Sequence, residues 1–446
     1  MNPSRLTEGS VKKSFILFSL PFLLSYFLQT LYGMADLFIT GQFSQTAQVS
    51  AVSIGSQVMH MLTVMIVGLM MGATVRVGQA TGAGDRQAAA RGIGSTITLS
   101  LFLAIGLTGL LLFLVQPIVQ LLQTPAEAVE ATASYLRICF LGLPFIIAYN
   151  LLSAIFRGLG DSRSPMYFIA FSCAVNIGLD CWFIGGLGMG AAGAAWGTIL
   201  AQAASVVFAL GYLYGRHYDI PLHKKDLRPD WPEVRALLRI GLPVCLQDGL
   251  IQIAFLLITV IANQRGLTDS AAVGITEKFI SFVFLVPSSL LATVSSLGAQ
   301  NIGAGKPERA REILRFSLEI AIGFGLIVSL LVQLCAAQIL GFFSSDPAVI
   351  QAGSGYLRGY IWDCLFAGMH FSFSGYFCAC SRSELSFIQN ATSVILFRVP
   401  GAWLMSRLFP TTLLPMGLAT TFSSLASVLI CLGLMRQIKP LTLQNA

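Results

Sequence analysis

The chain contains the same sequence pattern twice. Gln79–Gly84 returns as Gln300–Gly305, and the Tyr-Leu-Arg of residues 135–137 returns at 356–358, both 221 residues later. Short matches of this kind arise by chance, but an offset shared by separate matches is typical of an internal duplication. The chain is therefore expected to fold as two similar units.

The composition shows where such units reside. Hydrophobic residues make up 55% of the chain and charged residues only 11%, with a mean hydropathy of +0.76, whereas soluble domains carry about 25% charged residues. A helix needs about 20 apolar residues to cross the lipid hydrocarbon. We expect an all-α integral membrane protein with twelve spans, six in each copy, near residues 15–39, 50–74, 95–120, 134–156, 166–187, 191–214, 237–262, 271–297, 316–343, 354–378, 386–408 and 412–435.

Lys and Arg indicate how these spans are oriented. Of the 27 such residues, 21 fall in the N-terminal segment, in the even-numbered connections with their flanks, and in the C-terminal tail. Positive charge is retained on the cytoplasmic side, so both termini are expected in the cytoplasm and the chain in the cell membrane. This topology accounts for the net charge of +7, and no nucleic-acid partner is needed to explain it.

The longest polar stretch separates the two copies. It defines an N-lobe at 1–214, a cytoplasmic linker at 215–236 and a C-lobe at 237–446. Six spans per lobe bring both copies into the membrane from the same side, so the lobes are expected to be related by a pseudo-twofold axis along the membrane normal. Such pairs form a cleft that serves alternating access, which indicates a transporter.

Several classes of protein are excluded by missing motifs. The sequence has no nucleotide-binding loop, no metalloprotease helix and no nucleophile elbow, so an enzyme is not indicated and no cofactor is expected. Its nine cysteines lie almost entirely in apolar spans without metal-ligand spacing. Without a nucleotide-binding domain, transport must draw on an ion gradient or on a separate ATPase, and we expect the gradient.

Polar residues inside the first, fifth and sixth spans suggest where that ion binds. A charge at bilayer depth is costly and usually functional. Asp36 lies late in the first span, while Asn176 and Asp180, four residues apart, share one face of the fifth. With Thr198 of the sixth span they would form an oxygen-rich cluster for a monovalent cation or a proton. The alternative is that each aspartate only caps or hydrogen-bonds a helix.

These segments resemble the bacterial multidrug and toxic compound extrusion (MATE) family. The resemblance rests on "LPFLLSYFLQTLYGMADLFITGQF", on the repeated turn at Gln79–Gly84, on "FRGLGDSRSP" and on "NIGLDCWFIGGLGMGAAGAAWGTILAQ", and it covers essentially the whole chain. It implies a two-lobed exporter of twelve helices that exchanges H⁺ or Na⁺ for cationic amphipathic compounds. Some family members have a cation site in the N-lobe. The resemblance implies that Asp36, Asn176, Asp180 and Thr198 occupy the matching positions in this chain, and it implies no other metal site.

The resemblance also assigns a substrate cavity and a hinge. Tyr32 matches a family tyrosine one turn before the first-span aspartate, and Pro21 matches a proline at which that helix bends. Gln29 and Asn150 match polar residues of the N-lobe cavity. A second amide of that cavity is replaced here by Ser153, so contacts with the drug are expected to differ.

The C-lobe departs from the family pattern. Asp363 resembles the tenth-span aspartate of NorM-like members, but their seventh-span glutamate is replaced here by Ile251. Asp248 and Glu277 are the nearest acidic substitutes in the sequence. The three acids either form a second coupling site or hold the lobe together, and neutralisation of Asp363 by Arg398 would make the C-lobe group structural.

A flippase for lipid-linked precursors is the rival function, because such proteins share the duplicated lobes. They line the cavity with basic residues to hold a diphosphate, whereas the intramembrane charges here are mostly acidic. A membrane protein with a purely structural role would leave the clustered acids unexplained. We therefore expect a multidrug antiporter that acts as a monomer.

Overall fold

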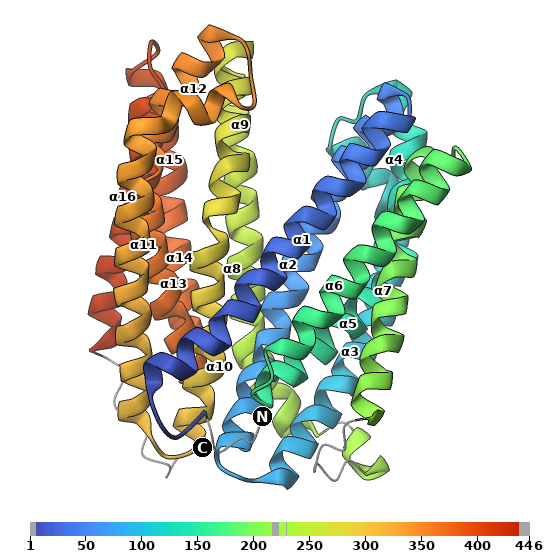
Figure 1. Ribbon diagram of the computed structural model, residues 1–446, viewed down its shortest axis with the longest axis vertical. Coiled ribbons are helices and arrows are strands. Elements are labelled where there is room, and N and C mark those ends of the chain that lie inside the picture. The colour runs from blue at the N-terminus through green and yellow to red at the C-terminus, as the bar shows by residue number, and fades with distance from the viewer. Residues whose placement is uncertain (1–5, 216–222, 229, 437–446) are drawn as a thin grey trace. The chain divides into compact units, whose positions relative to one another are not determined.

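Every regular element in the described part of the chain is a helix (Figure 1). The computed structural model describes residues 6–215, 223–228 and 230–436, so residues 216–222 and 229 of the predicted linker 215–236 lie outside it, as do both chain ends. The all-α class predicted from the sequence is confirmed.

The first half of the chain contains seven α-helices and three short helical turns. They are α1 (Val11–Phe43), α2 (Thr46–Gly82), α3 (Arg86–Leu121), η2 (Ala126–Ala128), α4 (Val129–Leu141), α5 (Leu143–Gly158), α6 (Arg163–Asp180), η3 (Cys181–Gly186), α7 (Gly190–Gly215) and η4 (Lys224–Leu227).

The second half repeats this sequence of long helices. It contains α8 (Trp231–Asn263), α9 (Leu267–Val283), α10 (Leu285–Gly303), α11 (Pro307–Gly341), α12 (Pro347–Tyr360), α13 (Asp363–Ala379), α14 (Ser383–Ser393), η5 (Val394–Arg398), α15 (Val399–Leu408) and α16 (Leu414–Met435).

The repeated sequence motif is explained by a repeated turn. Gly84 follows α2 with a φ of +72°, and Gly305 follows α10 with a φ of +71°. Only glycine adopts this left-handed conformation without strain, and it commonly ends helices. Each copy therefore keeps its glycine where a long helix ends and the next begins.

Nine helices of the described chain are long and apolar enough to cross a membrane. A tenth is obtained if Ala126–Leu141 and Leu143–Gly158, which meet at a 47° bend, form one span. The other two predicted spans, 354–378 and 386–408, correspond to α12–α13 and to α14–α15. Both are divided into shorter helices and contain buried charges, which lowers their hydropathy.

The described helices group into two compact units. Of the described residues, those within Leu24–Gly241 form one, and residues 6–23 together with 242–436 form the other. The units thus differ from the predicted lobes 1–214 and 237–446 at the starts of α1 and α8. In the second unit Phe15 packs edge-on against Phe316 with ring centroids 5.4 Å apart, and in the first unit Gly241 packs directly on the backbone of Leu69.

Apolar side chains lie on both the inner and the outer faces of the helices. Phe140 and Ile147 are fully buried in the core of the first unit. On α3, by contrast, Phe102 and Phe113 are 67% and 83% exposed. A helix that is apolar on all sides suits a lipid surrounding, and this agrees with a membrane-spanning protein.

Candidate functional site

The structure brings together the four N-lobe residues singled out from the sequence. Asp36 lies on α1, Asn176 and Asp180 on α6, and Thr198 on α7. The Thr198 hydroxyl lies 3.3 Å from Asp36 Oδ2 and 2.9 Å from the carbonyl oxygen of Ala194, in position to donate to either. The Asp36 carboxyl also interacts with the side chains of Asp180 and Asn176. We call these four residues the N-lobe cluster.

Most polar atoms of the N-lobe cluster are buried without a hydrogen-bond partner. Asp36 is 5% exposed, and Asn176 and Asp180 are fully buried. Among the described residues, no group makes a hydrogen bond to Asp36 Oδ1, to either carboxyl oxygen of Asp180 or to either amide atom of Asn176. Buried polar groups are nearly always paired. Five such atoms therefore lie close together in the N-lobe cluster, beside the contacts that its members make with one another.

The helices around the N-lobe cluster pack closely because α7 carries small residues. A Cβ atom built on Gly197 would collide with Asp180 Oδ1 and would lie 3.6 Å from Asn176 Nδ2. A Cβ atom on Gly193 would lie 3.2 Å from Phe183 and 3.3 Å from Ile184 of η3. Small residues let membrane helices approach each other, so Gly197 is what allows the polar face of α6 to lie against α7.

The backbone changes its hydrogen-bond pattern directly after Asp180. α6 ends there and continues as the π-helical turn η3, Cys181–Gly186. π-Helical turns within α-helices occur frequently at functional sites. The change in pitch re-aims the residues that follow Asp180, and no periodicity in the sequence predicts it.

The predicted cavity residues lie on α1 and α5. Tyr32 interacts with both Asp36 and Thr198, and its buried hydroxyl has no hydrogen-bond partner among the described residues. Gln29, one turn earlier, is half-buried. Asn150 and Ser153 are buried on α5, where Asn150 Nδ2 donates to the Ile146 carbonyl oxygen at 2.8 Å. Tyr32 is therefore the member of this set that contacts the N-lobe cluster.

The hinge residue predicted on α1 lies inside a continuous helix. Pro21 is buried within Val11–Phe43. A proline in a helix interior removes one backbone hydrogen bond and weakens the helix locally. The boundary between the two compact units, between Leu23 and Leu24, falls two residues later.

Two of the three candidate acids of the C-lobe, Asp363 and Glu277, interact with Arg398. Arg398, at the end of η5, is 8% exposed. Its Nη2 donates to the Tyr360 hydroxyl at 2.6 Å and lies 3.7 Å from Asp363 Oδ2. Glu277 interacts with Arg398 and accepts a hydrogen bond from Thr259 at 3.4 Å. Asp248 on α8 interacts instead with the thiols of Cys245 and Cys378.

A comparison with known protein families identifies the family of this chain. The family model MatE matches residues 21–182 and again residues 243–404. The chain belongs to the MatE family. The two matches lie 222 residues apart, which confirms the duplication inferred from the sequence.

Similar proteins cover nearly the same length as this MatE chain. The probable multidrug resistance protein YpnP of Bacillus subtilis is 28% identical over 95% of this chain and 95% of its own length. The multidrug export protein MepA of Staphylococcus aureus is 24% identical over 95% of this chain and 94% of its own. These relatives are transport proteins and not enzymes.

Solved structures share the fold. The outward-facing conformation of a multidrug resistance MATE family transporter superposes with a TM-score of 0.91 at 22% identity, covering 98% of both chains. MATE in the straight conformation gives a TM-score of 0.89 at 23% identity, again with 98% coverage of both. The MATE fold expected from the sequence is confirmed.

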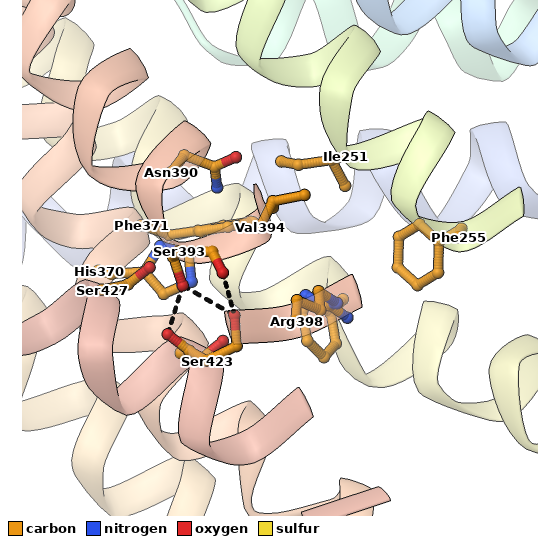
Figure 2. A pocket seen from close by; sticks show the side chains of 12 residues that line it. Ile251, Phe255, His370, Phe371, Asn390, Ser393, Val394, Arg398, Ser423 and Ser427 are labelled. Atoms are coloured by element: carbon orange, nitrogen blue, oxygen red, sulfur yellow. Dashed lines mark hydrogen bonds between the residues drawn. The ribbon is translucent and has the colours of Figure 1, made fainter. Parts of the chain in front are cut away.

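The sequence did not indicate two features of these sites. Gly197 precedes Thr198 in a run of small residues, and only its contact with Asp180 distinguishes it from its neighbours. The second is a pocket that Ile251 and Arg398 line together (Figure 2). In the part of the chain that the structure describes, no three His, Cys, Asp or Glu side chains are arranged to hold a metal ion.

Proposed function

We propose that this MatE chain is a secondary active multidrug efflux antiporter, which exchanges H⁺ or Na⁺ for cationic amphipathic compounds by alternating access. The N-lobe cluster carries this proposal, because it buries two carboxyl groups side by side with most of their oxygen atoms unpartnered. The similarity to YpnP, a probable multidrug resistance protein, and to MepA, a multidrug export protein, supports the same activity.

The chemistry of the N-lobe cluster suits a monovalent coupling ion. Carboxylate, amide and hydroxyl oxygens are ligands for hard cations such as Na⁺. Two carboxylates in a low-dielectric interior also repel each other, and a proton bound to either relieves that repulsion. Asp36 and Asp180 bind the coupling ion, Asn176 and Thr198 complete its polar surroundings, and Tyr32, Gln29, Asn150 and Ser153 line the adjoining substrate cavity.

The transport cycle then depends on competition for one negative charge. While Asp36 and Asp180 are ionised, they favour a cationic compound in the N-lobe cavity. Entry of H⁺ or Na⁺ from outside neutralises them and removes that attraction. The resulting change bends α1 near Pro21, where the helix already lacks a backbone donor, and the compound is expelled.

Ion coupling is assigned to the N-lobe rather than to the C-lobe. Asp363 and Glu277 share the buried cation Arg398, which already supplies positive charge there. Asp248, on α8, interacts electrostatically with Cys245 and Cys378. The three acids are therefore proposed to organise the C-lobe.

Charge also disfavours the rival flippase. A diphosphate cargo requires basic residues, whereas the charged side chains buried in the described chain are three aspartates and one arginine: Asp36, Asp180, Asp363 and Arg398. The protein is proposed to act as a monomer in the cell membrane with both termini in the cytoplasm. The N-lobe cluster is assembled within one unit of a single chain, which supports the monomer.

The test is uptake of a fluorescent organic cation into proteoliposomes under an imposed pH or Na⁺ gradient. The wild type is expected to transport under one gradient, which names the ion, and Asp36→Asn is expected to lose coupled transport. Glu308→Gln removes an exposed acid that pairs with Arg311 at 2.8 Å and should transport normally. Full gradient-driven transport by Asp36→Asn would refute the scheme, and a folded wild type inactive under both gradients would favour the flippase.

A further inference from the structure

The segment before α1 is held at the junction of α10 and α11. Three side chains of that junction donate to four consecutive backbone carbonyl oxygens, those of residues 6–9. The bonds run from Asn301 to Leu6 at 3.4 Å, from Lys306 to Thr7 at 3.0 Å, and from the two Nη atoms of Arg309 to Glu8 at 3.0 Å and Gly9 at 2.8 Å. Hydrogen bonds from charged donors are stronger than those between neutral groups. We call residues 6–9 the N-terminal strap.

The first part of α1 packs on the same helix, α11. The ring of Phe15 is fully buried and meets Phe316 edge-on. Lys12 Nζ lies 5.4 Å from the centroid of the same Phe316 ring, in a cation–π contact. The strap and α1 up to Leu23 therefore belong to the second compact unit, whereas α1 from Leu24 onward belongs to the first. We call residues 11–20, which precede Pro21, the first arm of α1.

The internal duplication shows that the donors to the strap are not part of the shared turn. The turn itself has the same backbone in both copies, since Gly84 and Gly305 have nearly equal φ angles. The residues found 221 positions before Asn301, Lys306 and Arg309 are Ala80, Asp85 and Ala88. None of these three side chains carries an N–H donor. The donors therefore distinguish the second copy from the first.

The first copy uses its turn differently. Asp85 accepts from the backbone N–H of Ala88 at 2.8 Å and so caps the start of α3. The start of α8 is held to the first unit by an ion pair of 2.9 Å between Arg76 of α2 and Glu233. Side chains thus pair with each other at the start of α8, whereas at the start of α1 they bind the backbone and fix the path of the chain.

We propose that Lys306 and Arg309 are positioning residues for transport, which hold the N-terminal strap and so keep the first arm of α1 fixed while the helix bends near Pro21. This inference rests on the proposed function, in which a coupling ion at Asp36 produces that bend. A hinge moves one arm in a defined direction only where the other arm is held. Without the strap, movement of the first arm would take up part of the bend.

The test uses a double variant, Lys306→Asp combined with Arg309→Ala, which gives the second turn the residues of the first. It removes three of the four bonds to the strap. Aspartate is favoured at a helix N-cap and would cap α11 as Asp85 caps α3, so the variant should fold with an unchanged melting temperature.

The first measurement is hydrogen exchange in residues 10–15 of the purified, detergent-solubilised full chain. These residues form the first turn of α1, where the Ser14 N–H donates to the Ser10 carbonyl oxygen at 3.1 Å. Exchange reports local opening. It should become about tenfold to a hundredfold faster in the double variant, as expected for the loss of charge-assisted hydrogen bonds.

The second measurement is transport by proteoliposomes, expressed per folded protein. The maximal rate of the double variant should fall about threefold to tenfold, because only molecules with a held first arm are competent. The half-saturation concentration of the driving ion should not change, because the N-lobe cluster is intact. Arg309→Lys keeps one charged donor and should lose less than the double variant. Arg315→Gln removes an exposed arginine of α11 and should match the wild type in both measurements.

Each failure has a separate signature. Unchanged exchange in the double variant would overturn the holding of the strap by Lys306 and Arg309. Faster exchange with a normal maximal rate, or a rate that falls only in step with the melting temperature, would overturn their positioning role. A wild type that transports under neither gradient would refute the proposed function and, with it, the role in transport, while the exchange measurement would still decide whether these donors hold the start of α1.

Discussion

Gly197→Ala is expected to damage ion coupling with little effect on the fold. The added methyl would collide with Asp180 Oδ1, and Asp180 is fully buried with no solvent into which to turn. Overpacking of this kind costs about 1–3 kcal/mol. Alanine in place of glycine within a helix stabilises the folded protein by about 1 kcal/mol. The net change in the free energy of unfolding is therefore between about zero and 2 kcal/mol.

The functional change should be larger than the change in stability. The clash, which costs about 1–3 kcal/mol, displaces the side chain of Asp180, which is proposed to bind the coupling ion. If this cost opposes ion binding, the affinity for the ion falls about fivefold to hundredfold. The assay is transport by proteoliposomes as a function of the concentration of the driving ion, read beside thermal unfolding in detergent. An increased half-saturation concentration with a small change in melting temperature is the expected pattern.

Gly178→Ala is the matched control. Gly178 lies on the same helix as Asp180, two residues earlier, and a Cβ atom there would meet nothing within 4 Å. The control should keep its ion affinity and should be slightly stabilised, by up to about 1 kcal/mol. An unchanged affinity in Gly197→Ala, or an equal loss in Gly178→Ala, would refute the reasoning.

Two other substitutions test the neighbouring contacts. Thr198→Val removes the hydroxyl near Asp36 and should weaken apparent ion affinity about threefold to tenfold. Thr198→Ser should restore that affinity, and a Val variant that matches the wild type in ion titrations would count against a role for the hydroxyl. Arg398→Gln leaves Asp363 buried without its cation and should destabilise the protein by about 3–5 kcal/mol. Thermal unfolding should show partial recovery when Asp363→Asn is added, and no recovery would argue against their pairing.

Much of the fold could be predicted because it depends on properties that a sequence displays. The repeat, the apolar spans and the left-handed Gly84 and Gly305 are local or periodic features. The division of the spans at α12–α13 and at α14–α15 is harder to predict from the sequence. These segments contain the charged residues Asp363 and Arg398, which are stabilised by buried polar groups on neighbouring helices. Those groups come from elsewhere in the chain and leave no pattern of their own.

The candidate site shows the same limit. Asp36 and the i, i+4 pair Asn176 and Asp180 could be selected because charged and amide groups are rare at membrane depth. Gly197 could not, because its role depends on which atom of α6 faces it. The π-helical turn after Asp180 is likewise decided by packing between helices, which short-range sequence patterns do not encode.

The shared starts of α1 and α8 bear on whether the halves can exist separately. A fragment that ends in the linker would lack the stretch Trp231–Gly241, and Gly72, which packs on Leu237, would lose its neighbour. The complementary fragment would lack the residues before Leu24, and Phe316 would lose Phe15. Each fragment would thus leave packed residues without their neighbours, so the two fragments are expected to accumulate in cells only when they are produced together.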